Sequence, residues 1–194
     1  MKRWRFAICL VALAAVVLVA AAPAYAQVSR ELIRNGDFTG VTEWSFKGEC
    51  AIWRSNSDQT NEWVEVLVPR CSGNIQLAQQ DLALKADTAY RLEFTGTSSA
   101  GHDLAVLVTT QQAPNEGLGL DAVCDFQSAA AEQPISWESC AVDFKMPEAQ
   151  QLRTQSQLRF WLTPFARADD LYRIDNVSLM EVGEPVDLNQ CTCR

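Results

Sequence analysis

The sequence contains few of the residue patterns that catalyse reactions. Its one histidine, His102, lies in an Ala-Gly-His-Asp segment typical of a hairpin turn, and a Ser-His-Asp hydrolase would have to use it. No Gly-x-Ser-x-Gly elbow, phosphate-binding loop or dinucleotide fingerprint occurs. With 24 acidic residues some carboxylates must lie close together, but no spacing singles out a glycosidase pair. We therefore predict that the protein is not an enzyme.

Tryptophans and polar residues on expected strands offer a different chemistry, the binding of sugars. A sugar ring stacks its C–H face on an indole, and its hydroxyls need directed donors and acceptors. Trp53 and Trp63 flank a polar loop, and Trp161 is out of phase with its apolar neighbours. Gln76 and Arg159 alternate with apolar residues and should face outward. We expect these five residues to contact a ligand, although each could instead pack in a core or lie at a solvated surface.

The N-terminal region, residues 1–26, has the organisation of a secretory signal peptide. Three basic residues precede an apolar run that ends at Ala24-Tyr25-Ala26. Its removal would leave 168 residues, enough for one domain, which we expect to be secreted or periplasmic. Those residues include 13 basic and 24 acidic ones, a net charge of −11 that disfavours nucleic acid and anionic lipid as partners. No second apolar run is long enough for membrane insertion after cleavage.

Six cysteines remain after the expected cleavage, and an even number in an exported chain indicates disulfides. Cys50 and Cys71 lie in neighbouring strand-like segments, as do Cys124 and Cys140. We therefore expect these two pairs, each closing a loop of about 20 residues, although six cysteines permit 15 connectivities.

The last two cysteines, Cys191 and Cys193, belong to a C-terminal tail, residues 183–194, that lies beyond the expected domain. They could pair with each other, link the protein to a partner or bind a metal. A zinc site is disfavoured, because the spacing is not Cys-x-x-Cys and only His102 could complete it. We favour a disordered tail whose cysteines pair opportunistically.

Short segments that alternate polar and apolar residues, separated by turns, dominate residues 27–182. This pattern predicts an all-β protein built as an antiparallel β-sandwich or barrel. The expected strands are 64–68, 74–79, 90–95, 104–108, 139–144, 157–162 and 171–179.

Four segments, in order, carry a family likeness. Residues 32–38 read Leu-Ile-Arg-Asn-Gly-Asp-Phe and are followed by Trp44. A strand with a central glutamine follows at 75–77, and residues 84–94 have the pattern L-x-x-x-x-x-Y-x-L-x-F. Residues 172–179 read Tyr-Arg-Ile-Asp-Asn-Val-Ser-Leu. Together they resemble the galactose-binding-like jelly rolls that include carbohydrate-binding module families four, nine and twenty-two.

The resemblance implies a jelly-roll sandwich over residues 31–182 with Phe38 and Trp44 as core anchors. The first and last segments should pair, and residues 35–37 should form a turn that tolerates positive φ. The sandwich should be closed by Ile174, Val177 and Leu179.

The same resemblance implies one structural calcium where the two chain ends meet. The matching acidic side chains are Asp37 and Asp175. The family often has a glutamate after the phenylalanine, where this chain has Thr39 and so lacks one oxygen ligand. Turn capping and strand-end hydrogen bonding are the alternative roles of both aspartates. No other cofactor is expected.

We predict a secreted, non-catalytic carbohydrate-binding module that binds a polysaccharide or other glycan on one sheet. The alternative is an extracellular or envelope protein-interaction domain that keeps the fold without binding sugar. Cys191 and Cys193 would then be candidates for a disulfide to a partner protein.

Overall fold

The computed structural model describes residues 30–40, 42–49, 51–68, 73–112, 115–127, 136–148, 155–185 and 187–194. The expected signal peptide and the expected Cys50–Cys71 pair lie outside the described residues. No helix in the described part of the chain is both long and apolar enough to cross a membrane.

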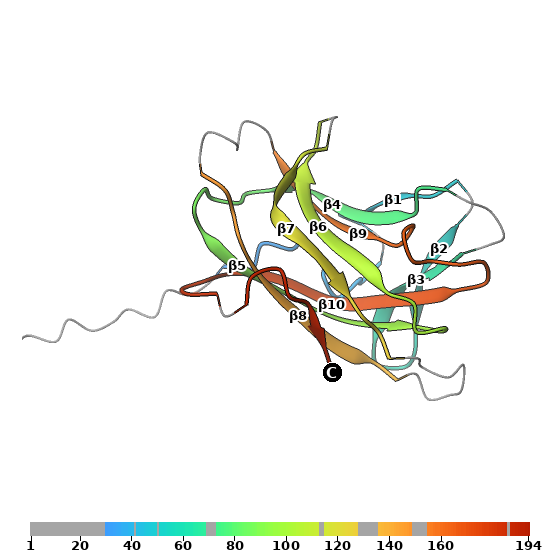
Figure 1. The fold of residues 1–194 in the computed structure, drawn as a ribbon. Coiled ribbons are helices and arrows are strands. Elements are labelled where there is room, and N and C mark those ends of the chain that lie inside the picture. The colour runs from blue at the N-terminus through green and yellow to red at the C-terminus, as the bar shows by residue number, and fades with distance from the viewer. Residues whose placement is uncertain are drawn as a thin grey trace, which may run out of the picture.

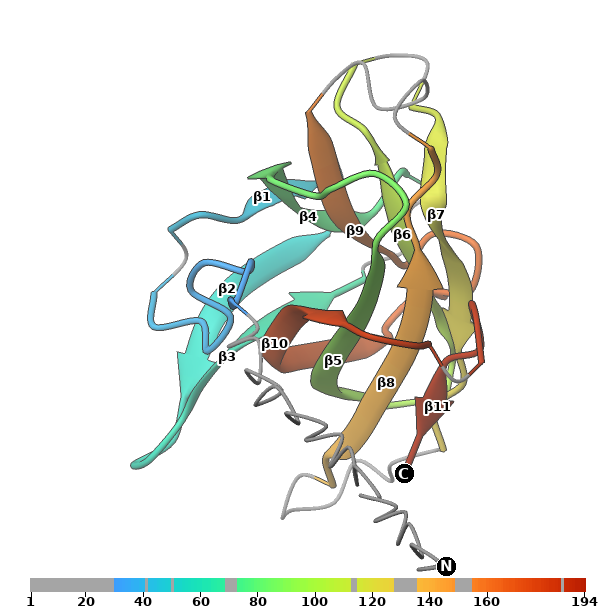
Figure 2. The same ribbon diagram turned by 90° about the vertical axis from the view of Figure 1, so that its left-hand side faces the viewer.

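The described strands form two antiparallel sheets that face each other, so the predicted all-β sandwich is confirmed (Figures 1 and 2). The five-stranded sheet has the order β1-β4-β9-β6-β7, and the six-stranded sheet has the order β11-β8-β5-β10-β3-β2. The strands are β1 Ser45–Lys47, β2 Ile52–Ser57, β3 Glu62–Leu67, β4 Gln76–Leu82, β5 Ala89–Ser98, β6 Leu104–Thr110, β7 Gly117–Cys124, β8 Glu138–Lys145, β9 Ser156–Trp161, β10 Leu171–Val182 and β11 Thr192–Cys193.

The core fills the space between the sheets because each strand turns alternate side chains inward. Strand β7 is a clear case, since Leu118, Leu120, Ala122 and Cys124 are buried and the residues between them are exposed. Strand β7 was not predicted, because its glycines weaken the strand pattern. Strands β1, β2 and β11 were not predicted either, because they are short or largely polar.

The N-terminal segment packs into the sandwich as the resemblance implies. Phe38 is fully buried, and its ring centroid lies 5.0 Å from that of Trp44. Leu32 N donates to Leu179 O at 3.0 Å, which joins this segment to β10. The expected core roles of Phe38 and Trp44 are therefore confirmed. The predicted closing residues Ile174, Val177 and Leu179 are also buried.

Position 36 needs a glycine because the backbone of Val177 lies very close to it, not because its φ is positive. Val177 N donates to Gly36 O at 2.9 Å, and a Cβ on Gly36 would lie 1.9 Å from Val177 O. The positive φ angles of this turn belong to Asn35 and Phe38 instead. The expectation that residues 35–37 tolerate a positive φ is thus confirmed at Asn35 rather than at Gly36.

The last residues of the chain are ordered, which corrects the expected disordered tail. Strand β11 pairs with β8 at the edge of the six-stranded sheet, as Figure 2 shows. Ser139 N donates to Arg194 O at 2.9 Å, and Arg194 N donates back to Ser139 O at 3.1 Å. Asn189 N donates to Asp143 O at 2.8 Å, which fixes the approach to β11.

The disulfides differ from the expected Cys124–Cys140 pair. Cys124 is bonded to Cys191, and Cys140 to Cys193. Cys124 ends β7 of the five-stranded sheet, while Cys140 lies in β8 of the six-stranded sheet. The C-terminal residues therefore link both layers covalently. Spacing along the chain could not show this, because the fold brings residues 191–193 between the two strands.

Candidate functional site

The outer face of the five-stranded sheet carries polar side chains that line a groove. Lys47 pairs with Gln76, and Ala78 pairs with Arg159, so these four side chains share one face of the sheet. Their neighbour Leu77 points the other way and is fully buried. We call this site the polar groove. It is lined by Ser45, Lys47, Gln76, Ala78, Gln80, Gln111, Asn115, Gln157 and Arg159.

Arg159 and Gln76 are fixed against each other in the polar groove. Arg159 Nε donates to Gln76 Oε1 at 2.6 Å, and its Nη2 donates to the same oxygen. Burial lowers the pKa of Arg159, and no carboxylate in the described residues offsets that cost of burial. A guanidinium held this way keeps donors that a ligand oxygen can use.

The glutamines of the groove are also held in place by hydrogen bonds. Gln157 is 7 % exposed, and its Nε2 donates to Thr109 Oγ1 at 3.1 Å and to Asn115 Oδ1 at 3.3 Å. Gln111 Nε2 donates to Asp81 Oδ1 at 3.0 Å. These hydrogen bonds from the side-chain nitrogens fix the two amide groups, and so they also set the directions of the amide oxygens of Gln157 and Gln111. Such preorganisation reduces the entropy lost when a ligand binds.

Trp161 lies on the same outer face, next to the polar groove. It pairs with Gln76 of β4 and with Ala105 of β6, and it is half-buried. Its indole Nε1 donates to Asn74 Oδ1 at 2.9 Å, which sets the orientation of the ring. The predicted outward direction of Trp161 agrees with this placement, whereas sugar stacking on it stays a prediction.

Trp53 and Trp63 do not lie on this face. Trp53 pairs with the buried Val66 and stacks on Phe46, with ring centroids 5.4 Å apart, so it packs against the core. Trp63 is on β3 of the other sheet, is 5 % exposed and makes an edge contact with Trp137. The structure therefore brings together Gln76, Arg159 and Trp161, and it separates the other two predicted residues from them.

Several groove residues were missed by the sequence analysis. The period of two places Gln80 beside Gln76 on β4, and Gln157 beside Arg159 on β9, so alternation alone could have found these. Lys47 sits on the three-residue strand β1, which carries too weak a pattern to predict. Ser45 lies on β1 and Ala78 on β4, and Gln111 and Asn115 lie between β6 and β7.

The outer face of the six-stranded sheet also carries charges, but these are paired. Glu65 is 3 % exposed and accepts hydrogen bonds from Arg54 at 2.6 Å and from Arg173 at 3.0 Å. Burial alone would raise the pKa of Glu65, but the hydrogen bonds from both arginines outweigh burial and lower it. On the same sheet, Arg91 donates to both oxygens of the buried Asp143. These charges are largely satisfied within the protein.

Asp37 and Asp175, the expected calcium ligands, lie near each other at the meeting point of the chain ends. Asp175 is fully buried and accepts hydrogen bonds from Asn61 Nδ2 at 2.6 Å and Asn176 N at 2.7 Å. Burial raises the pKa of Asp175, these hydrogen bonds lower it in part, and the charge of Asp37 raises it again. Among the described residues, no third His, Cys, Asp or Glu joins these two in a cluster. Backbone carbonyls would have to supply most ligands of a calcium here.

The one histidine is part of a hydrogen-bonded pair outside the polar groove. His102 Nδ1 lies 2.7 Å from Asp170 Oδ2, and Arg167 N donates to the same oxygen at 2.6 Å. None of these three residues is among the described residues that line the groove, and neither is any aspartate or glutamate.

No family model matches the chain. The search of curated proteins found no match either.

Solved structures do match. One titled "CBM4 structure and function" is 19 % identical, with a TM-score of 0.59 over 75 % of this chain and 99 % of its own. The N-terminal cellulose-binding domain of β-1,4-glucanase C from Cellulomonas fimi is 20 % identical, with a TM-score of 0.50 over 74 % and 97 % of the two chains. The CBM22-1 xylan-binding domain of Paenibacillus barcinonensis Xyn10C is 12 % identical, with a TM-score of 0.50 over 80 % and 97 %.

At these identities the matches establish the fold alone. The chain has the jelly-roll sandwich of these carbohydrate-binding modules, so the resemblance inferred from the four sequence segments is confirmed at the level of the fold.

Proposed function

We propose that this protein is an exported, non-catalytic carbohydrate-binding module whose glycan lies in the polar groove. The observation that carries the proposal is the partly buried Arg159, held by Gln76 and unpaired with any carboxylate in the described residues. Oriented amides and a guanidinium on one sheet provide the directed donors and acceptors that sugar hydroxyls need. Trp161 beside them supplies a surface on which a sugar ring can stack.

The described residues that line the polar groove include no carboxylate, which supports a binding role rather than a catalytic one. Glycoside hydrolysis ordinarily needs two carboxyl groups on either side of the scissile bond. The nine lining residues include none. Cleavage of a glycan bound in the polar groove is therefore not expected.

The charge of the groove favours an acidic glycan. Lys47 and Arg159 are its charged lining residues, in a chain whose net charge is −8. A uronic acid carboxylate would accept charge-assisted hydrogen bonds there, which are roughly twice as strong as neutral ones. We therefore propose that glycans carrying uronic acids bind more tightly than neutral ones of the same backbone.

Export is supported by the two disulfides, because such bonds persist in oxidising compartments. The expected signal peptide agrees with this location.

Titration calorimetry with defined oligosaccharides tests the proposal. The panel should contain cello-oligosaccharides, xylo-oligosaccharides and uronate-substituted xylo-oligosaccharides, each titrated into wild type and Gln76→Ala. We expect binding to wild type and a loss of affinity in the variant. No binding across this panel and a wider glycan array would contradict the proposal and favour the protein-interaction domain.

The structural calcium is a separate proposal and does not depend on sugar binding. If Asp37 and Asp175 hold the ion, calcium should raise the Tm of wild type and leave that of Asp37→Asn unchanged. Thermal unfolding with calcium, and with a chelator, measures this. Equal Tm values of wild type under both conditions would leave turn capping as the role of these aspartates.

A further inference from the structure

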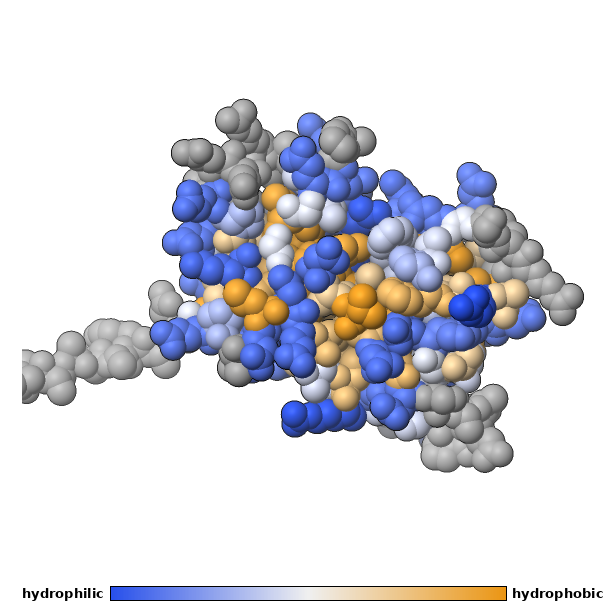
Figure 3. All heavy atoms as spheres, viewed as in Figure 1, coloured by the Kyte–Doolittle hydropathy of each residue, from blue (hydrophilic) through white to orange (hydrophobic). Residues whose placement is uncertain are grey.

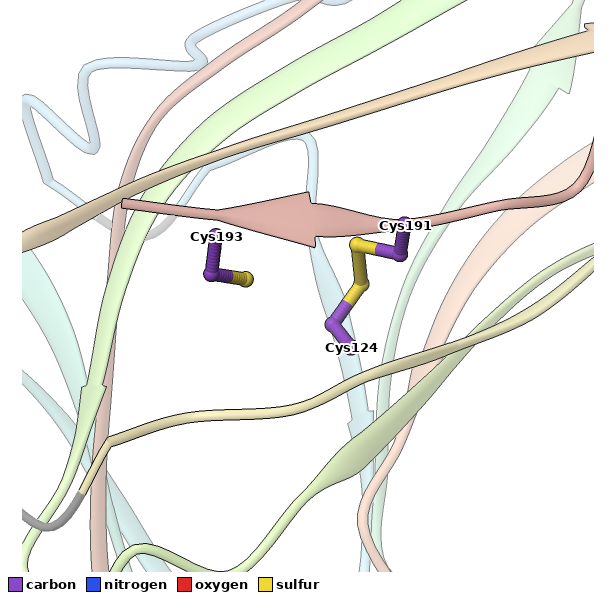
Figure 4. A group of neighbouring side chains, drawn as sticks. All are labelled: Cys124, Cys191 and Cys193. Carbon is purple, nitrogen blue, oxygen red and sulfur yellow. A yellow bond between two sulfur atoms is a disulfide. The ribbon is translucent and has the colours of Figure 1, made fainter. Parts of the chain in front are cut away.

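The C-terminal cysteines bring two disulfides into contact with each other. The sulfur atoms of Cys124, Cys191 and Cys193 all lie within 4.8 Å of one another, and Figure 4 shows the three side chains on the same side of β11. Cys193 is itself bonded to Cys140. A thiolate formed at Cys193 would thus lie beside an intact disulfide.

Burial makes the two ends of each bond unequal. Cys124 is fully buried and Cys140 is 2 % exposed, whereas Cys191 and Cys193 are only half-buried. An external thiolate must attack a sulfur along the S–S axis and expel the other sulfur. Attack from solvent therefore falls on a C-terminal cysteine and expels the thiolate of its buried partner.

We propose that Cys193 is the nucleophile of an internal thiol–disulfide relay that couples the Cys140–Cys193 and Cys124–Cys191 bonds. The substrate is a dithiol, either a small molecule or a dithiol oxidoreductase. Its first thiolate attacks Cys193 Sγ, which breaks the bond to Cys140, and the Cys140 thiolate takes up a proton. Its second thiolate then forms the reductant's own disulfide and expels the Cys193 thiolate.

The internal step is redox-neutral. The Cys193 thiolate attacks Cys124 Sγ or Cys191 Sγ, forms one S–S bond, breaks the Cys124–Cys191 bond and expels the thiolate of the other cysteine. A single two-electron reduction can therefore open either of the two disulfides that attach β11, Cys140–Cys193 or Cys124–Cys191. A bond between Cys124 and Cys193 needs only a small movement, because the two sulfur atoms already lie within 4.8 Å of each other.

Opening these bonds would alter a second pocket on the six-stranded sheet. Its walls include Arg91 and Asp143 of the sheet together with Gln190, Thr192 and Arg194 of the C-terminal segment. Movement of β11 removes one wall of this pocket and frees the edge of β8. The relay thus couples the thiol state of the surroundings to the shape of this surface.

Two matched variants test the relay. Cys140→Ser and Cys193→Ser each lose the same disulfide and each leave one of the four described cysteines unpaired, but only Cys140→Ser leaves the thiol at Cys193. After incubation at pH 8, exchange is stopped with acid, thiols are alkylated in denaturant, and peptides are mapped by mass spectrometry. In Cys140→Ser we expect the label on Cys124, Cys191 and Cys193. In Cys193→Ser we expect it on Cys140, with the Cys124–Cys191 bond intact.

A label confined to Cys193 in Cys140→Ser would overturn the proposal. So would an equal spread of label over Cys124 and Cys191 in Cys193→Ser, since no relay through Cys193 would then be needed. Wild type treated with one equivalent of dithiothreitol gives an independent measurement if a variant does not fold. In the molecules whose Cys140–Cys193 bond was opened, we expect a label on Cys140 and the second label shared among the other three cysteines. A second label on Cys193 alone would contradict the relay.

Discussion

Arginines on the outer faces of the two sheets have different surroundings. Arg173 of the six-stranded sheet donates to the buried Glu65, which also binds Arg54. Arg159 of the five-stranded sheet donates only to an amide oxygen, that of Gln76, and has no carboxylate partner in the described residues. The first arrangement satisfies its charges within the protein. The second leaves a cation available to a ligand, so the two faces are expected to serve stability and binding respectively.

The largest effect is expected from removing the buried charge of the paired face. Glu65→Gln should lower the free energy of unfolding at pH 7 by about 3 kcal/mol, because two arginines lose their anionic partner. The pKa of Glu65 is lowered from 4.5 in the folded state, so its contribution is present above that pH and is lost as the pH falls. Urea unfolding measured between pH 7 and pH 3 should therefore show that the free energy of unfolding falls more steeply with falling pH for wild type than for Glu65→Gln.

Glu93→Gln is the control for that comparison, because Glu93 is exposed on the same sheet. Its unfolding free energy should change by less than about 0.5 kcal/mol. If Glu65→Gln were as stable as this control, the paired face would not be a stabilising feature.

The next effect concerns the polar groove and should appear in binding rather than in stability. Arg159→Ala should weaken glycan binding by roughly 10- to 100-fold, the loss of a hydrogen bond from a charged group. Arg54→Ala, on the paired face, should bind the same glycan with unchanged affinity. Calorimetry with both variants separates the two faces, and similar losses in both would show that the groove is not the site.

A smaller effect is expected at the aromatic side chains. Trp161→Leu should lose about 1 kcal/mol of binding free energy, since a stacked ring contributes roughly that much. Trp63→Leu should keep its affinity, because Trp63 is buried on the other sheet against Trp137. Affinity electrophoresis in glycan-containing gels compares the two variants. If only Trp63→Leu bound the glycan more weakly, the binding site would lie on the six-stranded sheet instead of the five-stranded one.

The smallest effect is electrostatic. Lys47→Gln should weaken binding of a uronate-bearing oligosaccharide by about two- to threefold at low salt, as expected for an exposed charge. The difference should vanish in about 1 M salt, where screening is strong. Lys85→Gln is the control, because Lys85 pairs with Glu181 outside the groove. A loss of equal size for neutral glycans would argue against recognition of a carboxylate.

Much of the fold was accessible from the sequence. Strands β3, β4, β5, β6, β8, β9 and β10 each overlap a predicted segment, because most of these segments alternate polar and apolar residues and the others are short β-branched or apolar runs. The anchors Phe38 and Trp44 followed from the resemblance and are buried. Strand β2 was missed because its sequence, Ile-Trp-Arg-Ser-Asn-Ser, is mostly polar.

The candidate site was only partly accessible. Alternation shows which residues of one strand share a face, and the strand pairing places Gln76, Arg159 and Trp161 on one face, where Gln76 is only 4 % exposed. Alternation does not show which sheet a strand joins, and for that reason Trp53 and Trp63 were grouped with them. The cysteine pairing failed for a similar reason, since it depends on where the last strand lies in space.

The disulfides also determine how the chain would respond to a pulling force. Hydrophobic residues lie among hydrophilic ones across the face in Figure 3. Between the two sheets the buried side chains make noncovalent contacts, which a force can separate, whereas the two disulfides are covalent bonds. The Cys124–Cys191 bond spans a sequence separation of 67, so a chain stretched from its two ends cannot extend those residues. At about 3.5 Å per residue, roughly 230 Å of contour length stays hidden until thiols open both this bond and the overlapping Cys140–Cys193 bond.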